Sequence, residues 1–255
     1  MIENRRLYDI NDEVMKYCRS LLWESKDSRA VMYLKESGLI DETIYQFDLG
    51  YSGEDGGGII THLKSLGYSD DECKSVGICD DKGEIVDLFC DRVLFPVKNV
   101  EGKVEGFVGR ALRKQSGCSI FTQTNSDSPI FNCRKSLYGI EHAQRSDADY
   151  YIVSEGCVDT LMINQAGFDM AINPLLTDFS YEEIDLDSNR SVLLAFDSDN
   201  FGKESCAKAQ KAFLAAGYKV GIIDVSSYRD PAEFIRMAGV DAFAEKVRET
   251  KSLLT

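Results

Sequence analysis

The sequence contains only two histidines, His62 and His142, and its eight cysteines include no Cys-x-x-Cys pair. A structural zinc site needs clustered thiolates or imidazoles, so a zinc ribbon is not expected. The shortage of histidine also argues against catalysis by a Cys–His or Ser–His pair. Scattered cysteines are typical of proteins in a reducing compartment, where thiols pack as small hydrophobic groups.

Long apolar runs are absent as well. No run approaches the ~20 residues that a membrane-spanning helix requires. The first residues, Met1 to Arg6, lead into no apolar core of a signal peptide. We therefore expect no membrane association and a cytoplasmic location. The 255 residues, 44% of them hydrophobic, are enough for one large domain or two small ones with a buried core.

The net charge of −14 argues against indiscriminate binding to nucleic acid. The charge is unevenly spread, however, because residues 92–145 hold nine Lys/Arg against four Asp/Glu. A basic segment in an acidic chain can form a face for phosphates. The competing interpretation is that these charges are scattered over a solvated surface, and charge alone does not decide between the two.

The first half of the chain is predicted to be mostly helical and then to change to strands. Apolar residues recur at three- and four-residue spacing over residues 7–37, with a polar break, and short helices are predicted over 41–47, 59–66 and 70–76. Strands are predicted over 93–97 and 104–110, joined by a turn at 99–102, and residues 115–133 resemble a loop. The three glycines 56–58 suggest either a phosphate cradle or, without a following Lys-Ser/Thr, only a flexible turn.

After residue 150 apolar strands alternate with helices. Strands are predicted over 150–154, 170–172, 191–197 and 218–225, with helices over 158–166 and 203–216 and a last helical segment from Asp230. This alternation favours right-handed crossovers and a parallel sheet.

Acidic residues follow two of these strands directly. Glu155 and Asp159 come after the first strand, and Asp197 and Asp199 come after the third. The carboxyl ends of parallel strands are where ligands bind in open α/β sheets, and Mg²⁺ prefers carboxylate oxygens. The alternative for each acid is that it caps the helix that follows. For the set together, a metal site is the better interpretation.

The pattern Glu155-Gly156-x-x-Asp159 followed by Asp197-x-Asp199 resembles the Toprim signature of bacterial primases, topoisomerases and some nucleases. Further stretches resemble the catalytic core (RNA polymerase domain) of bacterial DnaG-type DNA primases, in the same order along the chain; they are Ala30 to Tyr51, Asp91 to Val97, Gly106 to Arg110, Leu137 to Gly139 and Asp197 to Gly202. The resemblance covers nearly the whole chain.

The resemblance implies an α/β fold. A smaller mixed α/β primase-core domain over residues 1–145 would precede a Toprim domain with a Rossmann-like parallel sheet over 146–255. The sequence also departs from the family. Its zinc ribbon and helicase-binding domain are missing, its Lys-Gly-Arg reads Cys133-Arg134-Lys135, and its Asp-Pro-Asp reads Asp230-Pro231-Ala232, which loses a ligand or shifts it to Glu233.

The function implied by the resemblance is template-directed synthesis of short RNA primers by metal-dependent nucleotidyl transfer. Catalysis would rest on Glu155, Asp197 and Asp199, and Mg²⁺ or Mn²⁺ would be held by these three with Asp159 and Asp230. Phosphates of template or nucleotide would be contacted by Arg92, Arg110, Arg113, Arg134, Lys135 and Lys203. For Arg110 the alternative is a structural salt bridge.

The implied partners are a single-stranded DNA template and ribonucleoside triphosphates, with a replicative helicase or a separate zinc-binding protein as further candidates. The alternative function is that of a Toprim nuclease, or of a non-polymerising nucleic-acid-binding module of a phage or mobile element.

Overall fold

The computed structural model describes residues 3–24, 28–80, 86–113, 119–125, 128–175 and 186–254. The chain divides into two compact units, one ending at Asn132 and the other beginning at Cys133. This division lies earlier than the boundary that we predicted between residues 145 and 146. The reason is that Leu137–Tyr138 pairs with Ala171–Pro174 and so joins the second sheet. Within the described ranges no helix is long and apolar enough to span a bilayer.

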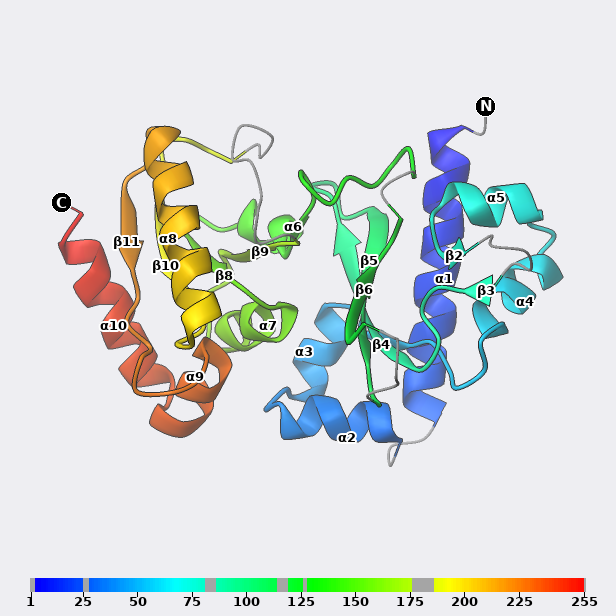
Figure 1. The fold of residues 1–255 in the computed structure, drawn as a ribbon, viewed down its shortest axis with the longest axis horizontal. Helices are drawn as coiled ribbons and strands as arrows, with labels where there is room; N and C mark the ends of the chain where they lie inside the picture. Colours follow the sequence, from blue (N-terminus) through cyan, green and yellow to red (C-terminus); the bar gives the residue numbers. More distant parts are fainter. Residues whose placement is uncertain are drawn as a thin grey trace. The chain divides into compact units, whose positions relative to one another are not determined.

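The first unit contains five helices and six strands within its described residues (Figure 1). They are α1 (Asn4–Glu24), α2 (Arg29–Glu36), α3 (Asp41–Gln46), β1 (Gly50–Tyr51), α4 (Gly58–Ser65), α5 (Asp70–Ser75), β2 (Cys79–Asp80), β3 (Val86–Asp87), β4 (Arg92–Lys98), β5 (Val104–Ala111) and β6 (Phe121–Gln123). Four strands form an antiparallel sheet in the order β1-β4-β5-β6, and β2 pairs with β3.

The predicted hairpin of β4 and β5 is present, but β6 corrects the prediction of a loop over 115–133. Phe121 pairs with Arg110 across the sheet. Three residues are too few for a periodic pattern, so pairing with β5 decides their structure. The core of this unit forms where α1 lays Leu7, Ile10 and Val14 in one apolar cluster with residues of the sheet.

The glycine-rich loop before α4 does not leave a helix end open for a phosphate. The carboxylate of Asp87 accepts the backbone N–H groups of Ile59 and Ile60, at 2.9 and 3.0 Å. These are among the N–H groups that a helix leaves unpaired at its start. The chain's own carboxylate occupies them, which favours the interpretation of a turn over that of a phosphate cradle.

The second unit is an α/β sheet domain. Its elements are β7 (Leu137–Tyr138), α6 (Ile140–Ala143), β8 (Tyr150–Ser154), α7 (Cys157–Gln165), β9 (Ala171–Pro174), β10 (Ser191–Ala195), α8 (Asn200–Ala215), β11 (Val220–Ile222), α9 (Pro231–Ala238) and α10 (Val240–Ser252). The order is β11-β10-β8-β9-β7, parallel except for the edge strand β7. The predicted parallel sheet is confirmed, and the last helical segment is two helices that meet at Gly239, where φ is 92°.

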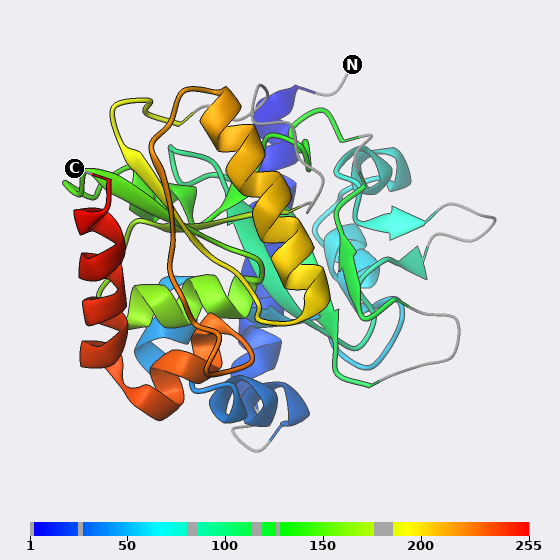
Figure 2. The same ribbon diagram turned by 60° about the vertical axis from the view of Figure 1, so that its left-hand side comes forward.

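Helices cover both faces of this sheet. Tyr151 and Val153 lie in one apolar cluster with Phe213 of α8. Ile152, between them, points to the other face and is equally buried. Figures 1 and 2 show α8 and α10 on opposite sides of β11. With both faces covered, the carboxyl ends of β8 and β10 are where polar side chains gather.

Candidate metal centre and phosphate-binding residues

Two neighbouring parallel strands place the predicted acids at one edge of the second sheet. Ser154, the last residue of β8, is in register with Ala195, the last residue of β10. Glu155 follows the first strand and Asp197 follows the second by two residues. The two acids are close enough for the backbone N–H of Asp197 to donate a hydrogen bond to the carboxylate of Glu155.

Gly202 makes the tight turn after β10 possible. A Cβ atom at this position would lie 2.4 Å from the backbone oxygen of Asp197, which no real side chain tolerates. The side chain of Asp199 then caps α8 by accepting the N–H of Gly202 at 2.8 Å. The Asp197-x-Asp199-x-x-Gly202 spacing therefore fixes the backbone on which both carboxylates sit.

The acids at this edge share an electrostatic environment that opposes their ionisation. Burial, with the nearby charges of Asp197 and Asp199, raises the pKa of Glu155 to about 7. Burial and the charges of Asp230 and Asp199 raise the pKa of Asp197 to about 6. Burial, followed by the charges of Asp197 and Asp230, holds the pKa of Asp159 well above its usual range. Like charges and burial thus outweigh the one opposing effect on Asp197, which is the positive charge of Arg229.

The remaining acids are tied into the local structure. Asp159, in the first turn of α7, accepts the N–H of Ala232 at 3.1 Å. Asp230 caps α9 by accepting the N–H of Glu233 at 2.7 Å, and its other oxygen accepts from Nε of Arg229 at 2.7 Å. Glu233, the alternative position for the ligand that Ala232 cannot supply, accepts the backbone N–H of Arg229 at 2.8 Å. Asp199 and Asp230 therefore cap the helices α8 and α9, as the alternative interpretation predicts. Capping uses one oxygen of each carboxylate and does not prevent the same side chain from binding a metal ion.

The donor set fits a hard divalent cation. Oε2 of Glu155 and Oδ1 of Asp197 are buried and accept no hydrogen bond from the described residues. In the described part of the chain, no three acidic, thiol or imidazole side chains are arranged to ligate one ion by themselves. Mg²⁺ does not require that, because it keeps several waters and is completed by substrate phosphates. Two carboxylates with unused oxygens and raised pKa values are the kind of partial shell that it binds.

Arg92, predicted to contact phosphates, has its guanidinium hydrogen-bonded within the first unit. It is buried and donates from Nη1 to the backbone oxygen of Ile120 at 2.9 Å and from Nη2 to that of Ser119 at 2.9 Å. Through these hydrogen bonds the guanidinium of Arg92 links β4 to Ser119 and Ile120, the two residues before β6. No local pattern predicts this, because the burial of a strand residue beside a loop depends on tertiary packing.

Arg110 is half-buried and Arg113 is exposed in the first unit. The guanidinium of Arg110 lies 4.1 Å from the ring centre of Tyr33 and 6.0 Å from that of Phe121, and it has no ion pair with any described residue. The salt-bridge alternative is therefore not supported there. Arg113, which is 57% exposed, lies 3.8 Å from both Glu54 and Asp91.

The other predicted cations belong to the second unit. Arg134 and Lys135 are exposed directly after Cys133, and Lys203 is exposed in the first turn of α8 beyond the cap Asp199. Sequence reasoning missed Arg229, whose charge lowers the pKa of Asp197 while Asp230 holds its Nε. Its position next to Asp230 in the sequence was the available signal.

Known families match both units. The family described as the DNA primase catalytic core, N-terminal domain, matches residues 17–144, and a Toprim-like family matches residues 152–235. The chain belongs to the DNA primase catalytic core family. A DNA primase of Clostridium acetobutylicum is 29% identical over 253 residues, which are 98% of this chain and 42% of that protein. The chain thus spans about two fifths of the length of this curated relative.

Solved structures of primase cores share the fold. A DNA primase domain from Pseudomonas aeruginosa has a TM-score of 0.81 at 27% identity, covering 96% of this chain and 78% of that one. A DnaG primase catalytic domain bound to single-stranded DNA has a TM-score of 0.81 at 23% identity, covering 96% and 79%. The resemblance read from the motifs and the predicted α/β fold with a Toprim domain are both confirmed.

Proposed function

We propose that this primase core joins ribonucleotides into short RNA primers on a single-stranded DNA template. The proposal rests on the carboxylates that follow β8 and β10, whose pKa values are raised by burial and by one another's charges. They occur in a chain of the primase core family. Other Toprim proteins share such acids, but the family match over residues 17–144 favours a primase over a nuclease or a non-polymerising module.

Glu155, Asp197 and Asp199 would hold Mg²⁺ or Mn²⁺, with Asp159 and Asp230 as further ligands. A bound ion would neutralise the triphosphate and favour attack by the primer 3′-hydroxyl. The protein's part is to present Oε2 of Glu155 and Oδ1 of Asp197, which are buried and accept no hydrogen bond from the described residues. Burial lowers the local dielectric constant and so strengthens the interaction of these oxygens with a cation.

Exposed or half-buried cations would bind the nucleic-acid and nucleotide phosphates. Arg110 and Arg113 are the candidates in the first unit, and Arg134, Lys135 and Lys203 are those in the second. Contacts of this kind supply most of the affinity for nucleic acid and make it dependent on salt. We leave Arg92 out of this set because its guanidinium is buried.

The test is a primer-synthesis assay with labelled ribonucleotides, single-stranded DNA and Mg²⁺ or Mn²⁺. Products longer than the input nucleotide are expected from the chain as it stands and not from Asp197→Ala. Cleavage of the DNA without new products would support the nuclease instead. A chain that binds DNA but neither extends nor cleaves it would be a binding module. A replicative helicase or a separate zinc-binding protein would then be the partner to add.

A cytoplasmic location is part of the same proposal, because the template and the ribonucleotides of a bacterial replication enzyme are cytoplasmic.

A further inference from the structure

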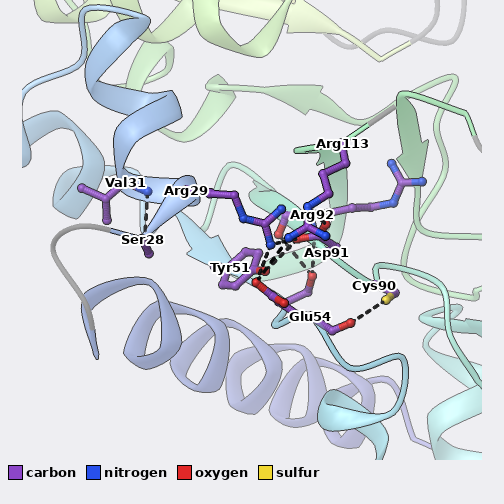
Figure 3. A network of polar contacts seen from close by, with 10 residues as sticks. Ser28, Arg29, Val31, Tyr51, Glu54, Cys90, Asp91, Arg92 and Arg113 are labelled. Atoms are coloured by element: carbon purple, nitrogen blue, oxygen red, sulfur yellow. Dashed lines mark hydrogen bonds and ion pairs between the residues drawn. The ribbon is translucent and has the colours of Figure 1, made fainter. Parts of the chain in front are cut away.

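The first unit contains a second cluster of charges, far in sequence from the carboxylates of the Toprim-like domain. It joins Arg29, the first residue of α2, with Glu54 in the loop after β1 and Arg113 just after β5 (Figure 3). Nη2 of Arg29 and Nη2 of Arg113 both face one oxygen of Glu54, Oε1, and the second pair is 3.8 Å apart. Two guanidinium groups that converge on a single carboxylate oxygen form an anion site.

A buried acid, Asp91, forms ion pairs with both arginines. Asp91, only 8% exposed at its side chain, lies 3.6 Å from Nη2 of Arg29 and 3.8 Å from Nε of Arg113. Its own position is set by the hydroxyl of Tyr51, which donates to Oδ1 at 2.7 Å. Asp91 therefore holds both guanidinium groups while leaving their outer faces to another anion.

Glu54 is that anion, and its side chain is the least constrained part of the cluster. Its backbone oxygen accepts from the thiol of Cys90 at 3.3 Å, and the N–H of Asp91 donates to the neighbouring oxygen of Gly53 at 2.8 Å. The loop backbone is thus held in place, whereas the Glu54 side chain is 65% exposed. Exposed ion pairs are weak, so a stronger anion can displace this carboxylate.

We propose that Arg29 and Arg113 bind a backbone phosphate of single-stranded nucleic acid, and that the Glu54 carboxylate occupies the phosphate position until nucleic acid displaces it. This goes beyond the proposed function, because neither Arg29 nor Glu54 lies in the basic segment or the predicted site. A phosphate on a nucleotide has the same chemistry. The nucleic-acid backbone is favoured because this cluster continues the basic segment that holds Arg110, whose guanidinium lies near the exposed ring of Phe121.

Charge balance gives the proposal a signature in salt dependence. The counter-ion released on binding comes from the nucleic acid, so Arg29→Gln, which removes one phosphate contact, should lower the slope of log K against log salt by about 0.7. Glu54→Gln removes only the competing carboxylate and should leave that slope close to the wild-type value. Affinity for the oligonucleotide rises by about fivefold, as expected when a weak exposed ion pair no longer competes.

The experiment measures fluorescence anisotropy of a labelled oligothymidylate with the full chain, over a series of NaCl concentrations and without ribonucleotides. Asp55→Asn is the matched control, because it removes the same charge at an exposed neighbour that has no ion pair within the described residues. Arg29→Gln should weaken binding, and adding it to Glu54→Gln should remove the gain. Thermal unfolding of each variant checks that the fold is kept.

Equal affinity for Glu54→Gln and Asp55→Asn would overturn the proposal, since only long-range charge would then be at work. An unchanged affinity in Arg29→Gln would also overturn it, as would a gain for ATP without a gain for the oligonucleotide. Primer synthesis is scored separately. A chain that shows the binding pattern but makes no primer refutes the proposed function alone, whereas primer synthesis with an inert Glu54 refutes this inference alone.

Discussion

The carboxylate of Asp159 accepts the backbone N–H of Ala232 at 3.1 Å and so joins the first turn of α7 to the first turn of α9. The two residues are 73 positions apart in the sequence. Asp159 is buried, and burial together with the charges of Asp197 and Asp230 raises its pKa. The side chain of Asp159 thus holds the start of α9 next to α7. When ionised, it also adds a negative charge that a bound metal ion would neutralise.

Asp159→Asn separates these two contributions. The amide oxygen can still accept from Ala232, and a buried charge is removed, so the melting temperature of the metal-free protein should stay the same or rise. Asp159→Ala removes the acceptor and should lower the melting temperature by several degrees, because a buried N–H without a partner costs about 1–3 kcal/mol. Differential scanning calorimetry in EDTA checks both. If the asparagine variant melts as low as the alanine variant, the hydrogen bond is not what matters at this position.

The raised pKa values of Glu155 and Asp197, about 7 and about 6, predict how metal-free stability depends on pH. Between each ordinary value and the raised one the folded state binds more protons than the unfolded state. These two groups should therefore make stability in EDTA fall as pH rises from about 4 to about 7, and Asp159, whose pKa is also raised, adds to the decline. Mg²⁺ should restore a few degrees of melting temperature at pH 8 and little at pH 5, because only ionised carboxylates bind it.

The matched control for this pH dependence is the pair Glu155→Gln and Asp197→Asn. Removing both ionisable groups should make the decline in EDTA shallower and abolish the Mg²⁺ effect at pH 8, while buried Asp159, whose pKa is also raised, keeps its own contribution. A decline as steep as that of the wild type would place its source outside Glu155 and Asp197.

The sequence predicted the parallel sheet and the strand ends that hold Glu155 and Asp197, because period and acid spacing are local signals. The helix cap at Asp199 was also predictable as an alternative, since Asp is favoured at that position. Features set by pairing across the sheet were not predictable. The strand β6 and the burial of Arg92 both depend on contacts between β4, β5 and residues that follow the hairpin, and no local pattern encodes them.

Arg92 should prove to be a stability residue and not a nucleic-acid contact. Arg92→Gln removes the hydrogen bonds to Ser119 and Ile120, each of the charged kind worth about 1.5–3 kcal/mol. The melting temperature should fall by roughly 5 °C or more, while the oligonucleotide affinity of the folded protein stays near that of the wild type. Urea unfolding and anisotropy on the same samples test this. Intact stability with lost binding would return Arg92 to the phosphate-binding set.

The exposed ring of Phe121 next to Arg110 predicts a stacking contact with a nucleic-acid base. Phe121 is 58% exposed on the edge strand β6. An exposed apolar side chain on an edge strand favours aggregation unless it binds a partner. Aromatic rings that stack on bases contribute about 1–3 kcal/mol each and do so with little dependence on sequence. Phe121→Ala should therefore weaken oligothymidylate binding by about tenfold at constant salt slope, since no charge is lost. Ile120→Ala, an exposed apolar neighbour, is the matched control and should have little effect. If both variants lose the same affinity, general apolar contact and not stacking explains the surface.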